Sequence, residues 1–116
     1  EGETTVDLVF TSQHVEVSPD DAVNVGVVVN ELVSNAAKYA FTQSTEGKVS
    51  VDLSKLEEGY CITVSDDGAG IVEGQSPEGT GLGMRIVTAI TKSLGTQLER
   101  LESDRGTTHR FVVSTK

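Results

Sequence analysis

Three polar residues, Glu31, Asn35 and Lys38, have the spacing of neighbours on one face of a helix. At about 100° of rotation per residue, with Glu31 at zero, Asn35 lies at roughly 40° and Lys38 at roughly −20°. An amide oxygen is a hard ligand suited to Mg²⁺, and a lysine one turn away could neutralise a phosphate. This row is therefore a candidate site for a metal and a phosphate, and an ordinary solvent-exposed helix face is the alternative.

Glycine is concentrated in one segment, where the backbone could approach a ligand closely. Six of the twelve glycines fall within residues 68–83, although each ordered glycine costs backbone entropy. Asp66-Asp67-Gly68-Ala69-Gly70-Ile71 leads into this segment directly after an expected strand. The Asp66 carboxylate could accept a hydrogen bond from a flat ligand, for which the exocyclic amine of adenine is a suitable donor. An acidic turn after a strand is the alternative.

Gly79-Thr80-Gly81-Leu82-Gly83 closes the same segment and opens an expected helix. The free N–H groups and the dipole at the start of a helix favour an anion. The segment is not a Walker loop, because no Gly-Lys-Ser/Thr follows it. A Rossmann site is also not indicated, because it needs a strand–helix–strand unit with an acid about 20 residues further on. The three segments together predict a Mg²⁺-nucleotide site built without a Walker motif.

The same three segments resemble the N, G1 and G2 boxes of sensor histidine kinases, in the same order and with similar spacing. The N box would be Asn30-Glu31-Leu32-Val33-Ser34-Asn35-Ala36-Ala37-Lys38-Tyr39-Ala40, and residues 66–71 and 79–83 would be the other two. The resemblance covers nearly the whole chain. It implies the catalytic, ATP-binding domain of these kinases, which has the Bergerat fold shared with type II topoisomerases and mismatch-repair ATPases.

Details of the motifs are most similar to the HWE/HisKA_2 branch of these kinases. The lid over residues 72–78 is short and lacks a phenylalanine-bearing F box, and Lys38-Tyr39-Ala40-Phe41 replaces the more usual Lys-His-Ser. Asn30 stands where the HWE group has a histidine before the glutamate, which favours the HisKA_2 side.

The resemblance implies a role for each matching residue. Asn35 would ligate Mg²⁺ through its amide oxygen, Glu31 would be the polar or basic group beside the γ-phosphate, and Lys38 would contact phosphate oxygens. These three form the implied catalytic set. Asp66 would accept a hydrogen bond from the adenine amine, and Thr107 would help to hold Asp66 and the base. The implied nucleotide-binding residues are Asn35, Lys38, Tyr39, Asp66, Gly68, Gly70, Ile71, Thr80, Gly81, Leu82, Gly83 and Thr107.

Six strands and two helices are expected to position these residues. Alternating apolar residues predict strands over Thr4–Phe10, His14–Val17, Lys48–Leu53, Tyr60–Ser65, Thr96–Leu101 and Thr107–Ser114. The helices are expected from Ser18-Pro19 to about Ala40, and over Gly81–Leu94 before a Gly95 cap. The predicted core stripe of the first helix is Ala22, Val25, Val29, Val33, Ala36 and Ala40. Two helices on one face of a mixed, mostly antiparallel sheet would form an α+β two-layer sandwich.

The length and charge of the chain limit the classes of partner. Its 116 residues correspond to one domain over residues 1–116, with 9 basic and 18 acidic residues and a net charge of −9. This balance argues against binding to nucleic acid or anionic lipid, and no apolar run reaches the ~20 residues of a membrane span. The single cysteine, Cys61, cannot form an internal disulfide and is expected in the core. A reducing, cytoplasmic compartment is therefore expected.

A phosphate acceptor is not expected within this chain. A histidine kinase transfers phosphate to an imidazole on a helical hairpin, whereas His14 and His109 fall in expected strands, and His109 is expected to be structural. The expected partners are a dimerisation and histidine-phosphotransfer domain, a sensor domain and a downstream response regulator, all outside the chain. Two alternatives are an anti-sigma factor serine kinase of the same superfamily and a degenerate module that docks a regulator without using ATP.

Overall fold

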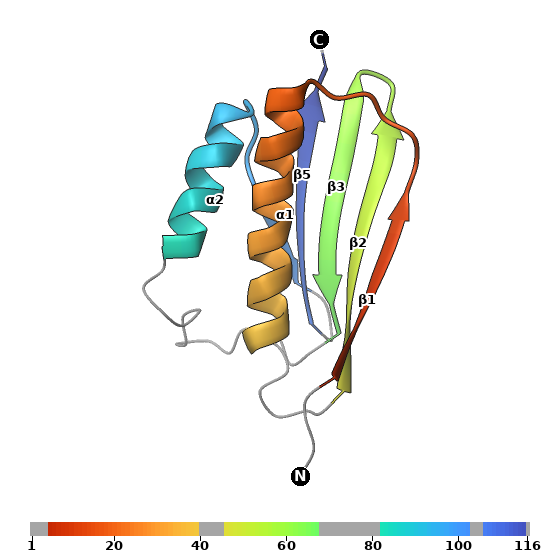
Figure 1. The fold of residues 1–116 in the computed structure, drawn as a ribbon, viewed down its shortest axis with the longest axis vertical. Coiled ribbons are helices and arrows are strands. Elements are labelled where there is room, and N and C mark those ends of the chain that lie inside the picture. The colour runs from red at the N-terminus through yellow and green to blue at the C-terminus, as the bar shows by residue number, and fades with distance from the viewer. Residues whose placement is uncertain (1–4, 40–45, 68–81, 103–105, 116) are drawn as a thin grey trace.

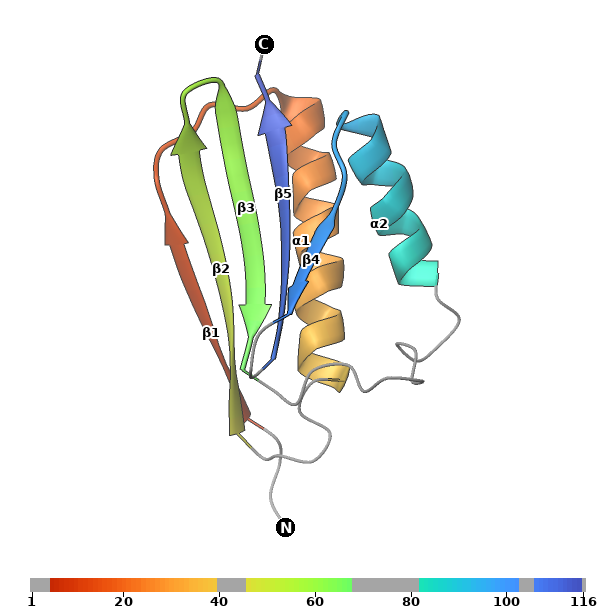
Figure 2. The same cartoon turned by 180° about the vertical axis from the view of Figure 1, so that it is seen from behind.

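The computed structural model describes residues 5–39, 46–67, 82–102 and 106–115, which form five strands and two helices. In chain order the elements are β1 (Thr5–Ser12), α1 (Pro19–Tyr39), β2 (Glu46–Leu56), β3 (Gly59–Asp66), α2 (Leu82–Ser93), β4 (Glu99–Glu102) and β5 (Thr107–Ser114). Figures 1 and 2 show both helices on one face of the sheet. The predicted α+β two-layer sandwich is confirmed.

The strands form a mixed sheet in the order β1-β2-β3-β5-β4. β1 is parallel to β2, and the other three neighbouring pairs are antiparallel. A parallel pair needs a crossover connection, and α1 provides it between β1 and β2. The helix therefore lies across the face of the sheet on which its apolar side can be buried (Figure 1).

The connection from β1 to α1 differs from the prediction, because His14–Val17 is not a strand. The N–H of Gln13 donates to the carbonyl of Leu53 at 3.0 Å, and regular pairing ends there. The two valines of the segment are half-buried and pack against the core. The alternation of polar and apolar residues over His14–Val17 therefore belongs to a connecting segment that lies against the core. α1 then begins as predicted, with the hydroxyl of Ser18 accepting a hydrogen bond from the N–H of Asp21 at 3.2 Å.

The end of α2 also follows the prediction and shortens the next strand. The N–H of Gly95 donates to the carbonyl of Lys92 at 3.0 Å, and the N–H of Thr96 donates to the carbonyl of Thr91 at 2.9 Å. Gly95 has a φ of 77°, and the two bonds form a Schellman motif. The N–H of Thr96 is thus not available for pairing in the sheet, and β4 begins at Glu99 and not at Thr96 as predicted.

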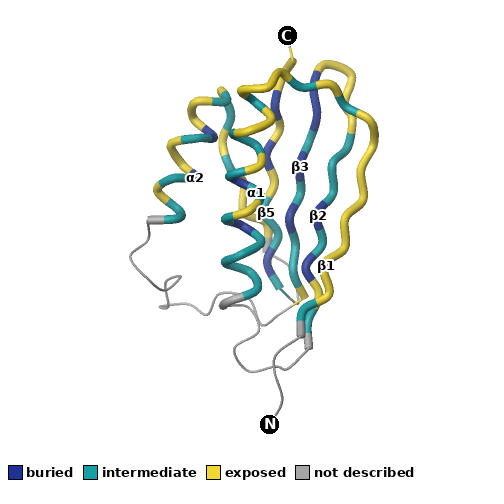
Figure 3. The backbone as a smooth tube through the Cα atoms, in the orientation of Figure 1, coloured by how far each residue is buried: buried dark blue, intermediate teal, exposed yellow. Residues whose placement is uncertain are grey.

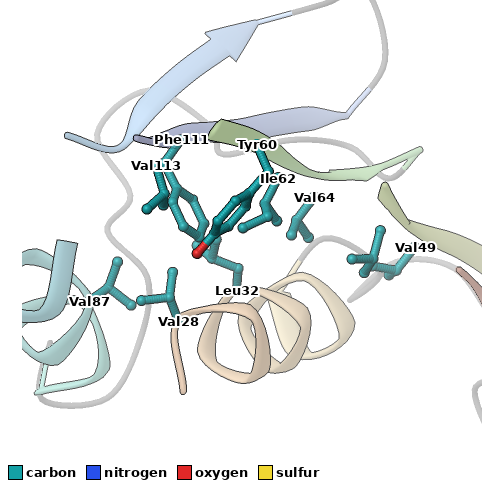
Figure 4. Close-up of a cluster of buried hydrophobic side chains, with 10 residues drawn as sticks. Val28, Leu32, Val49, Tyr60, Ile62, Val64, Val87, Phe111 and Val113 are labelled. Atoms are coloured by element: carbon teal, nitrogen blue, oxygen red, sulfur yellow. The ribbon is translucent and has the colours of Figure 1, made fainter. Parts of the chain in front are cut away.

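The core fills the space between the sheet and the helices (Figure 4). Its buried apolar residues are Val28, Leu32, Val49, Val51, Tyr60, Ile62, Val64, Val87, Phe111 and Val113. The prediction for the core stripe of α1 is wrong in its rotation, because Val28 and Leu32 form its centre and Ala22 is exposed. The remaining predicted stripe residues are half-buried, except Ala40, which lies outside the described residues. The buried side of α1 is therefore rotated from the predicted one toward the row of polar residues Glu31, Asn35 and Lys38. This rotation follows because α1 packs against α2 as well as against the sheet.

Cys61 belongs to the open face of the sheet and not to the core. Its Sγ lies 3.9 Å from Oγ1 of Thr63, and it is only half-buried. The neighbouring Ile62 is buried on the helix side, and successive residues of a strand point to opposite faces. The prediction of a core cysteine is therefore wrong.

β1 is an edge strand, and two of its helix-side residues, Leu8 and Phe10, are not covered. Leu8 and Phe10 pair with the buried Val49 and Val51 of β2, yet they are 48% and 63% exposed. Figure 3 shows β1 exposed along most of its length, whereas β2 and β3 each contain buried residues. The helix layer therefore does not extend over these two residues. Within the described ranges, neither helix has the length and hydropathy that a membrane crossing needs.

Candidate functional site

The first turn of α2 packs against the polar row of α1. A Cβ placed on Gly83 would lie 2.5 Å from Oε2 and 3.3 Å from Cδ of Glu31. The Glu31 carboxylate thus fills the space that the side chain of any other residue at position 83 would need. One turn further along α1, Nδ2 of Asn35 lies 3.6 Å from Sδ of Met84, within hydrogen-bond reach of the sulfur. Both candidate residues are half-buried and in contact with α2.

The contact with Met84 bears on the orientation of the Asn35 amide. A thioether sulfur is a weak acceptor and cannot donate a hydrogen bond. The amide nitrogen is therefore the group that suits it, and the amide oxygen lies at the other end of the group. Mg²⁺ is often held by one or two protein oxygens together with substrate phosphates and waters. The oxygen of Asn35 fits that pattern.

A metal site formed entirely by protein side chains would need several ligands close together. Within the described ranges, no three His, Cys, Asp or Glu side chains are grouped so that they could hold an ion. A magnesium ion at this site would therefore depend on Asn35 and on oxygens of the ligand itself.

Asp66 is the last residue of β3 and lies against the turn that begins β5. Gly106 has a φ of 83°, and a Cβ there would overlap the carbonyl oxygen of Asp66 and lie 3.0 Å from its Oδ1. The next residue, Thr107, is buried. Only glycine fits this position without displacing the end of β3, because it combines a positive φ with the absence of a Cβ. Gly106 thus lies directly against the end of β3 at Asp66.

The elements that carry these residues meet at one end of the molecule. In Figures 1 and 2 the carboxyl ends of α1 and β3 lie near the amino end of β5, and the amino end of α2 faces the same region. The contacts of the side chains bring Glu31 and Asn35 against the first turn of α2, and the end of β3 at Asp66 against Gly106. Lys38 and Tyr39 belong to the last turn of α1 and Leu82 begins α2, but the structure describes the side chains of none of these three. The other predicted residues, Gly68, Gly70, Ile71, Thr80 and Gly81, lie outside the described residues.

His109 lies on the helix side of β5, on the same face as Thr107. It pairs across the strands with Arg100 of β4. Burial and the positive charge of Arg100 lower the pKa of His109, so the imidazole is mainly neutral at pH 7. A neutral, half-buried ring suits the structural role predicted for it.

Met84 is the site residue that the sequence analysis did not assign. Its position directly after the glycine motif was a signal of proximity to the site. The residue type gave no such signal, because a methionine in a helix more often fills space in a core than contributes to a site.

A family model and a curated relative match nearly the whole chain. The family described as "Histidine kinase-, DNA gyrase B-, and HSP90-like ATPase" matches residues 20–116. The chain is 31% identical over 109 residues to blue-light-activated histidine kinase 2 of Erythrobacter litoralis (strain HTCC2594), and the match covers 92% of this chain and 32% of that protein. The chain therefore spans about a third of the length of this relative.

Solved structures of histidine kinases are similar over most of the chain. The histidine kinase domain of Erythrobacter litoralis EL346 has a TM-score of 0.83 at 30% identity, covering 93% of this chain and 54% of that one. The blue-light-activated kinase EL346 itself has a TM-score of 0.86 at 29% identity, covering 97% and 36%. The catalytic domain of histidine kinase ThkA has a TM-score of 0.72 at 22% identity, covering 94% and 78%, and shows the fold alone. The arrangement of two helices on a mixed sheet is thus one that these kinase domains share.

Proposed function

The chain belongs to the family of histidine kinase-, DNA gyrase B- and HSP90-like ATPases, and we propose that it binds Mg-ATP and donates the γ-phosphate to a histidine on a separate helical domain. The observation that carries the proposal is the contact of Glu31 and Asn35 with the first turn of α2, directly after the glycine motif. The name of the relative that is 31% identical, a histidine kinase, supports it.

The proposal assigns the chain to the catalytic domain of a two-component kinase. The dimerisation and histidine-phosphotransfer domain and the sensor domain would be other parts of the protein, and a response regulator would receive the phosphate next. The domain would act in the cytoplasm, where ATP is available, whether or not the whole protein is anchored in a membrane.

The nucleotide would be held at its two ends by different elements. The Asp66 carboxylate, which lies next to Gly106, would accept a hydrogen bond from the adenine amine, and Thr107 would help to hold it. The phosphates would lie at the amino end of α2, where backbone N–H groups are free and the helix dipole favours negative charge. Lys38 and Tyr39, in the last turn of α1, would also contact phosphate oxygens.

The transfer step would depend on position more than on covalent chemistry. Asn35 would hold Mg²⁺ through its amide oxygen, and the metal would neutralise charge on the phosphates when bound. Glu31, one turn earlier, would lie beside the γ-phosphate, where the acceptor imidazole must approach in line. Hydrolysis by the isolated domain should be slow, because most of the rate of such a step comes from a correctly placed acceptor.

Two measurements test this proposal together. Thermal unfolding of the chain with Mg-ATP at about 100 times its Kd should give about 2.7 kcal/mol of added stability. The chain is then incubated with radiolabelled ATP and the histidine-bearing helical domain of the same protein. The label should appear on that domain in an acid-labile form, as expected for phosphohistidine.

The contrary outcomes separate the alternatives. Absence of any stabilisation at millimolar Mg-ATP would indicate a module that docks a partner without nucleotide. Stabilisation with acid-stable label on a serine of a partner protein would indicate a serine kinase.

A further inference from the structure

We propose that the first turn of α2, through Gly83 and Met84, positions the two α1 residues on which the magnesium and phosphate chemistry depends. The inference rests on the proposed function. It adds a positioning role for Met84 and a second, positioning role for Gly83, beside the backbone contact with phosphate already proposed for that residue.

Gly83 positions Glu31 by leaving room for its carboxylate. The nearest atom to a Cβ at position 83 would be Oε2 of Glu31 at 2.5 Å, closer than any real Cβ contact. Glu31 is half-buried in this space, so its carboxylate would have to move if a side chain were added. The backbone N–H of residue 83, which is proposed to face a phosphate, would be unchanged by that addition.

Met84 positions Asn35 by accepting a hydrogen bond from its amide nitrogen. The Nδ2 to Sδ distance is 3.6 Å, and both groups are partly buried. A sulfur acceptor selects the amide nitrogen and leaves the oxygen for the metal. Partners that orient a metal ligand in this way commonly change metal affinity by about 10–100-fold when they are removed.

The two contacts act as a unit because of where they lie on the helices. Gly83 and Met84 are adjacent on α2, and Glu31 and Asn35 are one turn apart on α1. A shift of the first turn of α2 relative to α1 would therefore move the carboxylate and the amide together. The contact between α1 and α2 therefore couples the glycine motif of residues 79–83 to the carboxylate of Glu31 and to the proposed metal ligand Asn35.

The Met84 contact is tested by the dependence of ATP affinity on magnesium. The Kd for ATP is measured by calorimetry with excess Mg²⁺ and with EDTA, and the factor by which Mg²⁺ tightens binding is compared between variants. Met84→Leu keeps the bulk but removes the acceptor, and it should lower this factor by about tenfold. Met84→Gln restores an acceptor at similar length and should keep the factor near that of the unmodified chain.

The Gly83 contact is tested by kinetics of the whole kinase. Gly83→Ala should lower kcat for autophosphorylation by about tenfold or more, because the Glu31 carboxylate is displaced, while KM for ATP stays within about twofold. The matched control is Gly26→Ala on α1, where nothing lies within 4 Å of an added Cβ. Glu31→Asp withdraws the carboxylate, so Gly83→Ala should have little further effect in that background.

The result that overturns the inference differs from the result that overturns the function. Loss of all ATP binding by the unmodified chain would contradict the proposed function itself. If the unmodified chain binds Mg-ATP, an unchanged magnesium factor in Met84→Leu would show that the contact with Asn35 is packing alone. The loss of kcat caused by Gly83→Ala is measured in the unmodified kinase and again in the Glu31→Asp variant. If the two losses are equal, residue 83 does not act through Glu31.

Discussion

Asn35 is the residue whose substitution should separate metal binding from folding. Its amide lies at the edge of the core, in contact with Met84, and not within the core itself. Asn35→Ala should therefore change the free energy of unfolding by less than about 1 kcal/mol, while the effect of Mg²⁺ on ATP affinity is lost. Denaturant unfolding and calorimetry with and without Mg²⁺ measure the two quantities. Asn30→Ala, at an exposed position of the same helix, is the control. Retained magnesium dependence in Asn35→Ala would exclude the metal role.

Asp66 should determine which base is bound. A carboxylate accepts from the amine of adenine, whereas guanine presents an acceptor at the same position. Asp66→Asn should weaken ATP by about 10–100-fold, as expected for loss of a hydrogen bond to a charged group, and should reduce the preference for ATP over GTP. The control is Asp67→Asn, because the Asp67 carboxylate accepts from the N–H of Lys48 at 2.9 Å and so has a structural partner. Equal weakening of both nucleotides by Asp66→Asn would indicate that the carboxylate only supports the fold.

At the scale of elements, prediction from sequence succeeded where the signal is local. The start of α1 is fixed by the Ser18 cap and the end of α2 by Gly95, and both signals are contained in a few neighbouring residues. The strands predicted over Lys48–Leu53 and Tyr60–Ser65 are close in the chain and pair as neighbours, β2 and β3. His14–Val17 failed because alternation of apolar and polar residues is the same for a strand and for a connector lying on a core. The pairing partner that decides between them is distant in sequence.

The rotation of α1 could not be predicted for a related reason. The helix carries valines at positions 23, 25, 27, 28, 29 and 33, so it is apolar on several sides. Periodicity then does not single out a face, and the contact with α2 determines which side is buried. The same limit applies to the candidate site. The glycine motifs predict from the sequence that the backbone can approach a ligand closely. The contact between Met84 and Asn35 could not be predicted in this way, because it depends on how α1 and α2 pack.

Two glycines with similar backbone angles, one in the turn before β5 and one after α2, should differ in how much stability is lost when each is replaced by alanine. Gly106 and Gly95 have φ values of 83° and 77°, but a Cβ at 106 would overlap the backbone of Asp66, whereas one at 95 meets nothing within 4 Å. Gly95→Ala should cost about 1 kcal/mol of stability for the left-handed conformation alone. Gly106→Ala should cost about 3 kcal/mol or more, and it should also weaken ATP binding because the end of β3 is displaced.

Denaturant midpoints and ATP titrations of the two variants check this prediction. Similar losses of stability at both positions, with unchanged ATP affinity in Gly106→Ala, would mean that the turn yields and that Asp66 does not depend on it.

At the scale of the whole molecule, one buried polar atom among the described residues has no hydrogen-bond partner, and its burial lowers the stability of the fold. Tyr60 is 1% exposed, and its hydroxyl has no hydrogen-bond partner among the described residues. Figure 4 shows it among apolar side chains of the sheet and helices. Removal of an unpaired buried hydroxyl recovers its desolvation cost, so Tyr60→Phe should raise the free energy of unfolding by about 1 kcal/mol. Tyr60→Ala, which removes the ring as well, should instead lower it by about 3–5 kcal/mol. A loss of stability in Tyr60→Phe would show that the hydroxyl is satisfied in solution.

The stability of the whole fold should also depend on pH through His109. Burial and the charge of Arg100 lower its pKa below the ordinary value of 6.5. The unfolded chain therefore binds a proton more readily than the folded one, and the free energy of unfolding rises with pH in this range. The stabilisation is complete above pH 6.5 and is lost as the pH falls toward the lower pKa of the folded state. Thermal midpoints of the chain should therefore decrease between about pH 7.5 and about pH 5.5.

Variants of the two histidines assign this decrease to one ring. His109→Gln should flatten the dependence over the same pH window, because glutamine does not titrate. His14→Gln should leave it unchanged, since the His14 side chain is 84% exposed. An equal slope in His109→Gln and the unmodified chain would place the pH dependence elsewhere in the molecule.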